Sequence, residues 1–374
     1  MQLVAYGAQD IYLTGNPQIT FFKVVYRRHT NFSMEAIQQT MNGTVGRGGR
    51  QTATISRNGD LITRMYLNFT TTCALNAMNP GHHCIDYVEL EIGGQKIDKH
   101  YGHWMETWAE LTEPNDGAFL SDNDFEDQGT KFQIMAKAGG LVGDGNPVDA
   151  SVPLQFWFCR NPGLALPLIA LQYHEVKVTV NWGPNGRGVT PSNESLFVDY
   201  IYLDTDERRR FAQQSHEYLI EQVQHERSGT LSTLLNFNHP VKELIWTGET
   251  TEATGNRITF DRGTNFLLKL NGHDRFAERP LKYFCCNQVW QHHTGTPVNG
   301  GNGSGAGSAS TNEIAVYSFA LKPEEHQPSG TCNFSRIDNA VLSYDANIRN
   351  INIYAVNYNV LRIMSGMGGL AYSN

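Results

Sequence analysis

Alternation of apolar and polar residues with a period of two runs through this chain, and it restricts the possible folds more than any other feature. Residues 175–182 are the clearest example, because every second side chain is apolar. The apolar positions are Val176, Val178, Val180 and Trp182. Successive side chains of a β-strand point to opposite faces, so this strand is expected to bury one face and expose the other. Residues 183–186, with the sequence Gly-Pro-Asn-Gly, are expected to end it.

Two further segments show the same period. In residues 87–92, valine, leucine and isoleucine alternate with glutamate. Gly93 and Gly94 follow directly and suit a two-residue hairpin turn, whose backbone needs positive φ. Residues 61–69 alternate in a similar way. Strands with one apolar and one polar face are typical of antiparallel sheets. The sequence therefore predicts an all-β protein made of antiparallel sheets.

Helical periodicity is limited to three short segments, which we expect in the connections between strands. The first has one apolar stripe, made of Trp104, Met105, Trp108 and Leu111. A second helix is expected at residues 281–289, just after Pro280. The third is the charged segment 204–211, in which Asp204 and Glu207 have the spacing of a capping box.

The length of 374 residues favours two domains over a single core. Strand, turn, aromatic helix and strand follow one another in the same order in both halves of the chain. A duplicated sandwich of eight short strands per copy, the jelly-roll pattern, fits this order, although two unrelated β-rich halves remain an alternative. The predicted division is an N-terminal arm at 1–19, a first jelly roll at 20–203, a linker at 204–211 and a second jelly roll at 212–374.

Composition narrows the possible functions. Only 18% of the residues are charged, which suits a surface covered by neighbouring subunits but also a neutral monomer surface. With a net charge of −8, the chain lacks the excess of basic residues that is typical of nucleic-acid-binding proteins, so we expect no direct contact with nucleic acid. No apolar run reaches the roughly 18 residues of a membrane helix, and no secretory signal is visible. Synthesis in the cytosol is therefore expected.

No catalytic, cofactor-binding or metal-binding pattern stands out. The chain lacks G-x-S-x-G, H-E-x-x-H and Walker motifs, and its six cysteines are scattered, as is typical of free thiols. His100 and His103 lie close in sequence, as do residues 82–84, but neither set has a second pair at ligand spacing. The acidic run at 122–127 lacks the glycine and final glutamate of a calcium loop. The glycine-rich segment 295–310 is expected to be an exposed loop.

Several stretches resemble one protein family, the major capsid proteins of large icosahedral DNA viruses, the algal viruses above all. Residues 2–28 resemble the start of these proteins and residues 357–374 resemble their end. Between them, further matching stretches follow in the family's order at 57–63, 88–101, 162–177, 199–205, 216–222 and 327–338. The resemblance covers nearly the whole chain. It implies a double jelly roll: two eight-stranded antiparallel β-sandwiches side by side, with a few short helices in the connecting loops.

The resemblance also implies a function. Three copies of such a protein form a capsomer with a pseudo-hexagonal outline, and capsomers tile the shell. The implied partners are two further copies in a homotrimer, neighbouring capsomers, minor capsid proteins and the inner viral membrane beneath the shell. The protein would be made in the host cytoplasm and end in the virion, with no enzyme activity and no cofactor. A carbohydrate-binding or cupin-like jelly roll and a minor capsid protein are the alternatives.

Candidate assembly residues lie near both ends of the chain. In the arm they are Tyr6, Asp10 and Tyr12, and in the C-terminal strand Tyr354 and Tyr358. The C-terminal segment 351–363 is apolar on both faces, whereas a sandwich strand in a monomer needs only one apolar face. The second face is therefore expected to meet either another subunit or the sister domain, and the sequence leaves both possibilities open.

Overall fold

The computed structural model describes residues 7–17, 24, 26–72, 75–114, 129–140, 142–144, 147–183, 190–249, 260, 263–295, 314–345 and 350–372. The chain separates into two compact units, Met1–Phe32 and Ser33–Asn374. The first unit contains the short helices η1 (Ala8–Asp10) and α1 (Ile11–Thr14). This unit extends beyond residue 19, where the sequence placed the end of the arm.

The first half of the chain forms one antiparallel sandwich. One sheet has the order β1 (Phe32–Gln39), β12 (Thr190–Leu203), β4 (Leu61–Thr72) and β10 (Leu166–Pro167), and β9 (Pro147–Pro153) also pairs with β4. The facing sheet has the order β2 (Met41–Gly43), β3 (Arg50–Thr54), β11 (Val176–Trp182), β6 (Ile85–Ile92) and β7 (Gln95–Tyr101). A separate pair is formed by β5 (Leu75–Met78) and β8 (Val142–Asp144).

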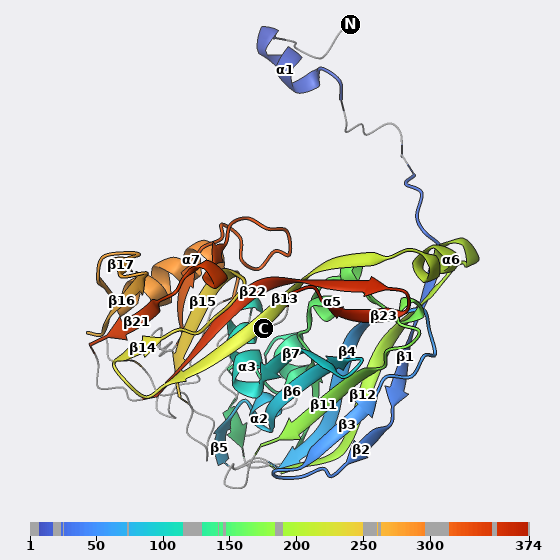
Figure 1. Cartoon of the computed structure of the whole chain (residues 1–374), viewed down its shortest axis with the longest axis horizontal. Helices are drawn as coiled ribbons and strands as arrows, with labels where there is room; N and C mark the ends of the chain where they lie inside the picture. Colours follow the sequence, from blue (N-terminus) through green and yellow to red (C-terminus); the bar gives the residue numbers. More distant parts are fainter. Residues whose placement is uncertain are drawn as a thin grey trace, which may run out of the picture. The chain divides into compact units, whose positions relative to one another are not determined.

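The second half forms a second antiparallel sandwich. One sheet has the order β13 (His216–Ser228), β22 (Ile351–Met364), β15 (Pro240–Gly248) and β19 (Ile314–Ser318), joined by β20 (Cys332–Asn333) on β15 and β23 (Met367–Leu370) on β22. The facing sheet contains β14 (Ser232–Leu234), β21 (Ala340–Tyr344), β16 (Asn265–Leu270), β17 (His273–Asp274) and β18 (Arg279–Pro280). Among the described residues, each sheet draws its strands from one half of the chain only (Figure 1).

The sandwiches contain more strands than the eight expected for each. The first, for example, has two five-stranded sheets. Interrupted edges account for part of the difference. Strand β10 pairs with the start of β4, and β9 pairs with its later part from Tyr66 to Thr72, so the two short strands share one edge. In the second sandwich, β19 and β20 share an edge of β15 in the same way.

Short helices lie in the connections. They are α2 (Pro80–His83), α3 (Gly102–Thr112), α4 (Lys131–Ala136), α5 (Trp157–Arg160), η2 (Pro162–Leu164), η3 (Leu168–Ala170), α6 (Thr205–Gln213), the π-helix η4 (Tyr283–Asn287), α7 (Gln288–His292) and η5 (Phe334–Arg336). All three helices expected from the sequence are present: α3, α6 and the η4–α7 segment. Asp204 caps α6 by accepting a hydrogen bond from the amide of Thr205.

Aromatic side chains join the two sheets inside each sandwich. In the first, the rings of Phe69 on β4 and Trp182 on β11 meet edge to face with their centroids 5.1 Å apart. In the second, Trp246 of β15 lies 5.3 Å from Phe266 of β16 and 5.2 Å from Phe284 of η4. Each such buried ring removes a large apolar area from water, which is the main stabilising contribution to a core. Phe69 and Trp182 lie on the apolar faces that the period-two alternation predicted, and both are buried between the sheets.

Candidate assembly site and the junction between the sandwiches

The two sandwiches share a buried interface, which we call the junction. Strands β13, β15 and β22 of the second sandwich pack there against α3, α5 and β7 of the first. Figure 1 shows the long strands β13 and β22 crossing close to α3 and β7. Buried residues of the first core, such as Trp104 and Trp108, form one continuous apolar cluster with Ile245, Tyr354 and Val356. The second sandwich therefore has a core on one face of its β22 sheet and the first sandwich on the other.

Tyr354 lies at the centre of the junction and is only 1% exposed. Its hydroxyl is 3.0 Å from Nδ1 of His103 in α3, and its ring stacks on His225 of β13 at 4.8 Å. Its neighbour on the same face of β22, Val356, is fully buried in the same cluster. Within this part of β22, the second face meets the sister sandwich, which is one of the two alternatives left open by the sequence.

Tyr358 is 5% exposed and also faces inward. Its hydroxyl donates to the carbonyl oxygen of His326 at 2.9 Å, and Nζ of Lys242 lies 5.1 Å from the ring centroid. Burial and the nearby Glu221 carboxylate raise its pKa. Tyr354 and Tyr358 therefore hold structure within one chain and expose almost no surface to a second copy. Their role in assembly stays a prediction.

Buried charges reinforce the junction. Glu221 of β13 is 4% exposed and accepts from Arg160 of α5 at 2.7 Å and from Lys242 of β15 at 2.8 Å. His326 adds a contact at 3.3 Å. Burial favours the neutral carboxyl, but Arg160, His326 and Lys242 outweigh it and lower the pKa of Glu221 to about 2. Because Arg160 comes from the first sandwich, this cluster ties the two together.

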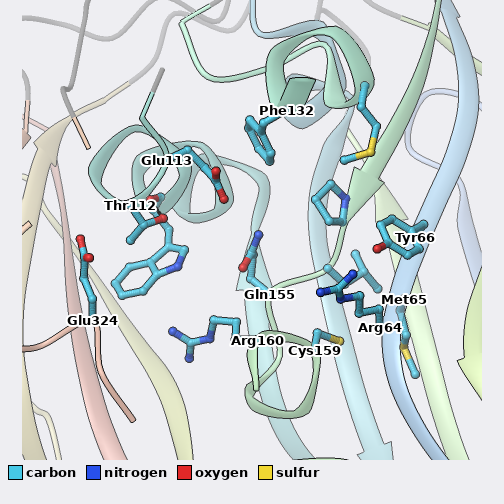
Figure 2. A pocket seen from close by; sticks show the side chains of 14 residues that line it. Arg64, Met65, Tyr66, Thr112, Glu113, Phe132, Gln155, Cys159, Arg160 and Glu324 are labelled. Atoms are coloured by element: carbon cyan, nitrogen blue, oxygen red, sulfur yellow. Dashed lines mark hydrogen bonds between the residues drawn. The ribbon is translucent and has the colours of Figure 1, made fainter. Parts of the chain in front are cut away.

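A cavity of about 420 Å³ lies beside Arg160 (Figure 2). Glu113 and Gln155 point into it from opposite sides. Burial, and then the charge of Glu324, raise the pKa of Glu113. The cavity is lined by two arginines, Arg64 and Arg160, and by two glutamates, Glu113 and Glu324. Because charges of both signs are present, the lining does not select for an anion or a cation.

The C-terminal hairpin of β22 and β23 fastens the second sandwich to the first, an arrangement that we call the clasp. The amide of Tyr173 donates to the carbonyl oxygen of Gly366 at 2.9 Å, and Nδ1 of His174 lies 2.9 Å from the carbonyl oxygen of Gly368. Gly366 has φ of 80°, and a Cβ there would lie 2.6 Å from the Tyr173 ring. A Cβ on Gly93 would overlap the His174 ring. Three stretches that carry the family resemblance thus meet at one place.

The arm candidates have a different setting. Tyr6 lies outside the described residues. Asp10 accepts from the amide of Gly7 at 2.8 Å, which stabilises the start of η1. Tyr12 is 91% exposed.

In the Ser33–Asn374 unit, the most exposed large apolar side chain described is Trp290 of α7, at 82%, with Leu321 at 75%. Sequence reasoning passed over Trp290 because helical periodicity picks out the buried stripe of a helix and ignores its opposite side.

The other candidates considered from the sequence lie partly inside and partly outside the described residues. In the described part of the chain, no group of three or more histidine, cysteine, aspartate or glutamate side chains could hold a metal ion. Arg208 of α6 pairs with Asp60 at 3.0 Å. The acidic run at 122–127 and nearly all of the glycine-rich segment, 296–310, lie outside the described residues. Among the helices that are described, none is long and apolar enough to cross a membrane.

Comparison with known proteins connects this architecture to a family. The N-terminal model of major capsid proteins matches residues 20–204, and the model for the large eukaryotic DNA virus major capsid protein matches residues 207–369. The chain is 53% identical to the major capsid protein of Pyramimonas orientalis virus and 43% identical to that of Paramecium bursaria Chlorella virus 1. Both alignments cover 100% of this chain and 99% of the relative.

The similarity extends to three dimensions. The crystal structure of PBCV-1 VP54 superposes with a TM-score of 0.78 at 39% identity, covering 95% of this chain and 100% of that one. These matches confirm the double jelly roll and set aside the carbohydrate-binding, cupin-like and minor-capsid alternatives. The domain boundaries and the assembly role of the arm stay predictions. A chain with two joined sandwiches and full-length relatives of this kind belongs to the family of large eukaryotic DNA virus major capsid proteins, and its place is in the shell of a virion.

Proposed function

We propose that three copies of this chain form a capsomer with a pseudo-hexagonal outline, and that these capsomers tile an icosahedral shell. The observation that carries the proposal is the junction, which joins two similar sandwiches through a buried apolar cluster and the Arg160–Glu221 ion pair. Three such pairs supply six similar blocks around a three-fold axis. A closed trimer then fits a six-fold position of the lattice.

The proposed partners are neighbouring capsomers, minor capsid proteins and the inner viral membrane beneath the shell. The arm supports contacts beyond the capsomer, because its described side chains are exposed apart from the partly buried Asp10, and Tyr12 and Tyr26 are 91% and 88% exposed. The net charge of −8 supports a shell that does not bind nucleic acid directly. Synthesis and assembly in the host cytoplasm and the lack of enzyme activity are parts of the same proposal.

Sedimentation of the purified protein at micromolar concentration tests the trimer. We expect a species with three times the 41.9 kDa mass of one chain. Obligate interfaces of this kind bury roughly 2,000 Å² or more, so the trimer should persist on dilution. A stable species of 41.9 kDa would contradict the proposal for the isolated protein.

Trp290 is our candidate for a contact between copies. It is 82% exposed, and the carbonyl oxygen of Leu321, another exposed residue, lies 3.2 Å from Nδ1 of His292, two residues further along α7. Tryptophans that become buried at an interface often contribute about 2 kcal/mol or more. Trp290→Ser should therefore weaken the trimer by about 30-fold or more while the monomer keeps its fold. Leu231→Ser, at a 50% exposed position between β13 and β14, is the matched control and should sediment like the unaltered protein.

A further inference from the structure

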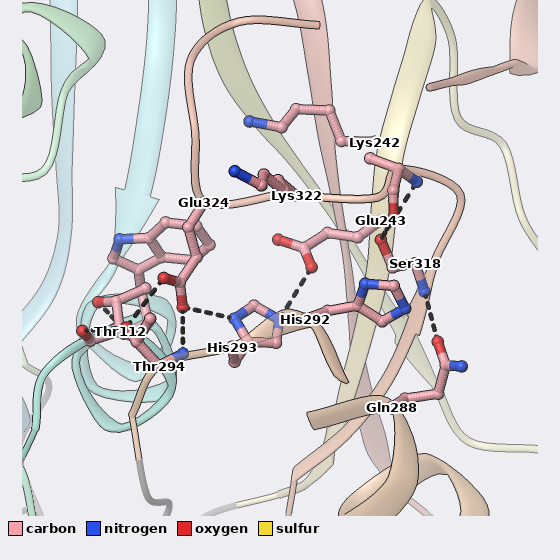
Figure 3. A network of polar contacts seen from close by, with 12 residues as sticks. Thr112, Lys242, Glu243, Gln288, His292, His293, Thr294, Ser318, Lys322 and Glu324 are labelled. Atoms are coloured by element: carbon pink, nitrogen blue, oxygen red, sulfur yellow. Dashed lines mark hydrogen bonds and ion pairs between the residues drawn. The ribbon is translucent and has the colours of Figure 1, made fainter. Parts of the chain in front are cut away.

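A second polar network at the junction centres on His293, which follows α7 directly (Figure 3). Its side chain is fully buried. Nε2 lies 3.0 Å from a carboxylate oxygen of Glu243 on β15, and Nδ1 lies 3.0 Å from a carboxylate oxygen of Glu324. A neutral imidazole has one N–H, whereas both nitrogens here face carboxylates. The geometry therefore calls for the doubly protonated, charged ring.

The residues that follow His293 bind the first sandwich. The amide of Thr294 donates to Glu324 at 2.9 Å, and the Thr294 hydroxyl lies 3.1 Å from the carbonyl oxygen of Thr112 at the end of α3. The amide of Gly295 donates to the carbonyl oxygen of Leu111 at 2.7 Å. Glu324 thus contacts both the charged ring and the segment that binds α3. We call His293, Glu243, Glu324 and Thr294 the histidine latch.

Loss of the proton would remove the cation that contacts both carboxylates. Lys242 also interacts electrostatically with Glu243, but its Nζ is paired with Glu221 at 2.8 Å. Glu243 is fully buried, and its Oε1 has no hydrogen-bond partner among the described residues. The groups that face His293 are Glu243 from β15, Glu324 from the segment after β19, and the uncharged Trp108 ring from α3, with centroids 6.4 Å apart. An uncompensated buried carboxylate is costly, so the local structure would have to open to admit water.

We propose that His293 acts as a proton-dependent latch, which holds segment 293–295 on α3 while the ring is charged and loosens the junction when the ring loses its proton. Glu221, Arg160 and Lys242 form a separate tie between the sandwiches. Release of segment 293–295 from α3 is therefore local and leaves the two sandwiches joined. It is a property of the single chain, beyond the assembly proposed above.

The pH range follows from the two carboxylates. Burial disfavours the charged ring, but Glu243 and Glu324 outweigh burial and raise the pKa of His293 to about 9. A group whose pKa is higher in the folded state stabilises the fold fully below its unfolded pKa, about 6.5, and that contribution is lost as the pH rises through the folded value. The latch should thus be closed at pH 6.5 and open above pH 9.

Amide hydrogen exchange on the full-length protein tests the latch, with rates corrected for the intrinsic effect of pH. In peptides containing Thr294 and Gly295, protection should be constant up to about pH 6 and then fall by at least ~10-fold by pH 10. His293→Gln should show low protection with no such fall. His273→Gln, at an exposed histidine of β17, is the matched control and should behave like the unaltered protein.

Glu324→Gln provides an independent variant in case His293→Gln fails to fold. It removes one of the two charges that favour the protonated ring, so the midpoint of release should move to lower pH. Unchanged protection of the unaltered protein up to pH 10 would overturn the proposal. So would an equal fall in His293→Gln, or a midpoint that stays in place in Glu324→Gln. Sedimentation in the same buffers separates these outcomes from any change in oligomeric state.

Discussion

Single buried charges affect the stability of this chain more than its modest overall charge indicates. Lys242 is 1% exposed and Glu221 is 4% exposed, so neither charge is screened by water. Removing one member of such a pair leaves the other buried without compensation, at a cost of about 3–5 kcal/mol. Glu221→Gln should therefore lower the free energy of unfolding by about that amount in urea denaturation at pH 7. Glu217→Gln, which breaks an exposed pair with Arg362, should cost less than ~1 kcal/mol.

The same carboxylate gives the unaltered protein a distinct acid response. Although burial opposes ionisation, Arg160, His326 and Lys242 lower the pKa of Glu221 to about 2. A carboxyl with a lowered folded-state pKa contributes stability above its unfolded value, near 4.5, and loses it as the pH falls through about 2. The stability difference between the unaltered protein and Glu221→Gln should shrink across that window. A difference that stays constant from pH 5 to pH 2 would mean that Glu221 is not the titrating group.

Among the elements, the strands and helices were largely predictable and their long-range contacts were not. The period of two placed β4, β6 and β11, and apolar stripes placed α3 and the η4–α7 segment, because these patterns depend on neighbours in sequence. Strand β22 shows the limit. Because both faces of β22 are apolar, the sequence predicted that both would be covered. It could not say by what, since contact with the sister sandwich and contact with another subunit both favour apolar residues on the second face. The arginine that pairs with Glu221 had no signal in the local pattern at all.

The hairpin between β6 and β7 offers a matched test of the clasp. Gly93 and Gly94 both have positive φ, 59° and 85°, so alanine at either position strains the backbone, at a cost of about 1–2 kcal/mol. A Cβ on Gly94 meets nothing within 4 Å, whereas one on Gly93 overlaps the ring of His174. Gly93→Ala should therefore destabilise the protein by an additional ~1–3 kcal/mol. Thermal unfolding of the two variants measures this difference, and equal losses would show that His174 moves away at little cost.

At the scale of the whole molecule, the described buried core lies in one of the two units. The Ser33–Asn374 unit contains all of the buried core clusters among the described residues, whereas η1 in the arm buries no side chain. The resemblance to capsid proteins predicted the family, the double jelly roll and the shell, because it drew on nearly the whole chain. It could not place the assembly contacts, since these depend on surfaces that one chain presents to another.

This division gives the last prediction. Deleting residues 1–30 should change the thermal unfolding midpoint of the remaining chain by no more than ~1–2 °C, because exposed termini contribute little to a core. The shortened chain should also sediment as the proposed trimer. Electron microscopy of assembled material should then show isolated capsomers instead of closed shells, since the arm carries the exposed Tyr12 and the proposed contacts beyond the capsomer. Tyr12→Ser should produce a milder form of the same defect. Earlier unfolding of the shortened chain would show that the arm packs on the folded unit, and normal shells would remove Asp10 and Tyr12 from the assembly contacts.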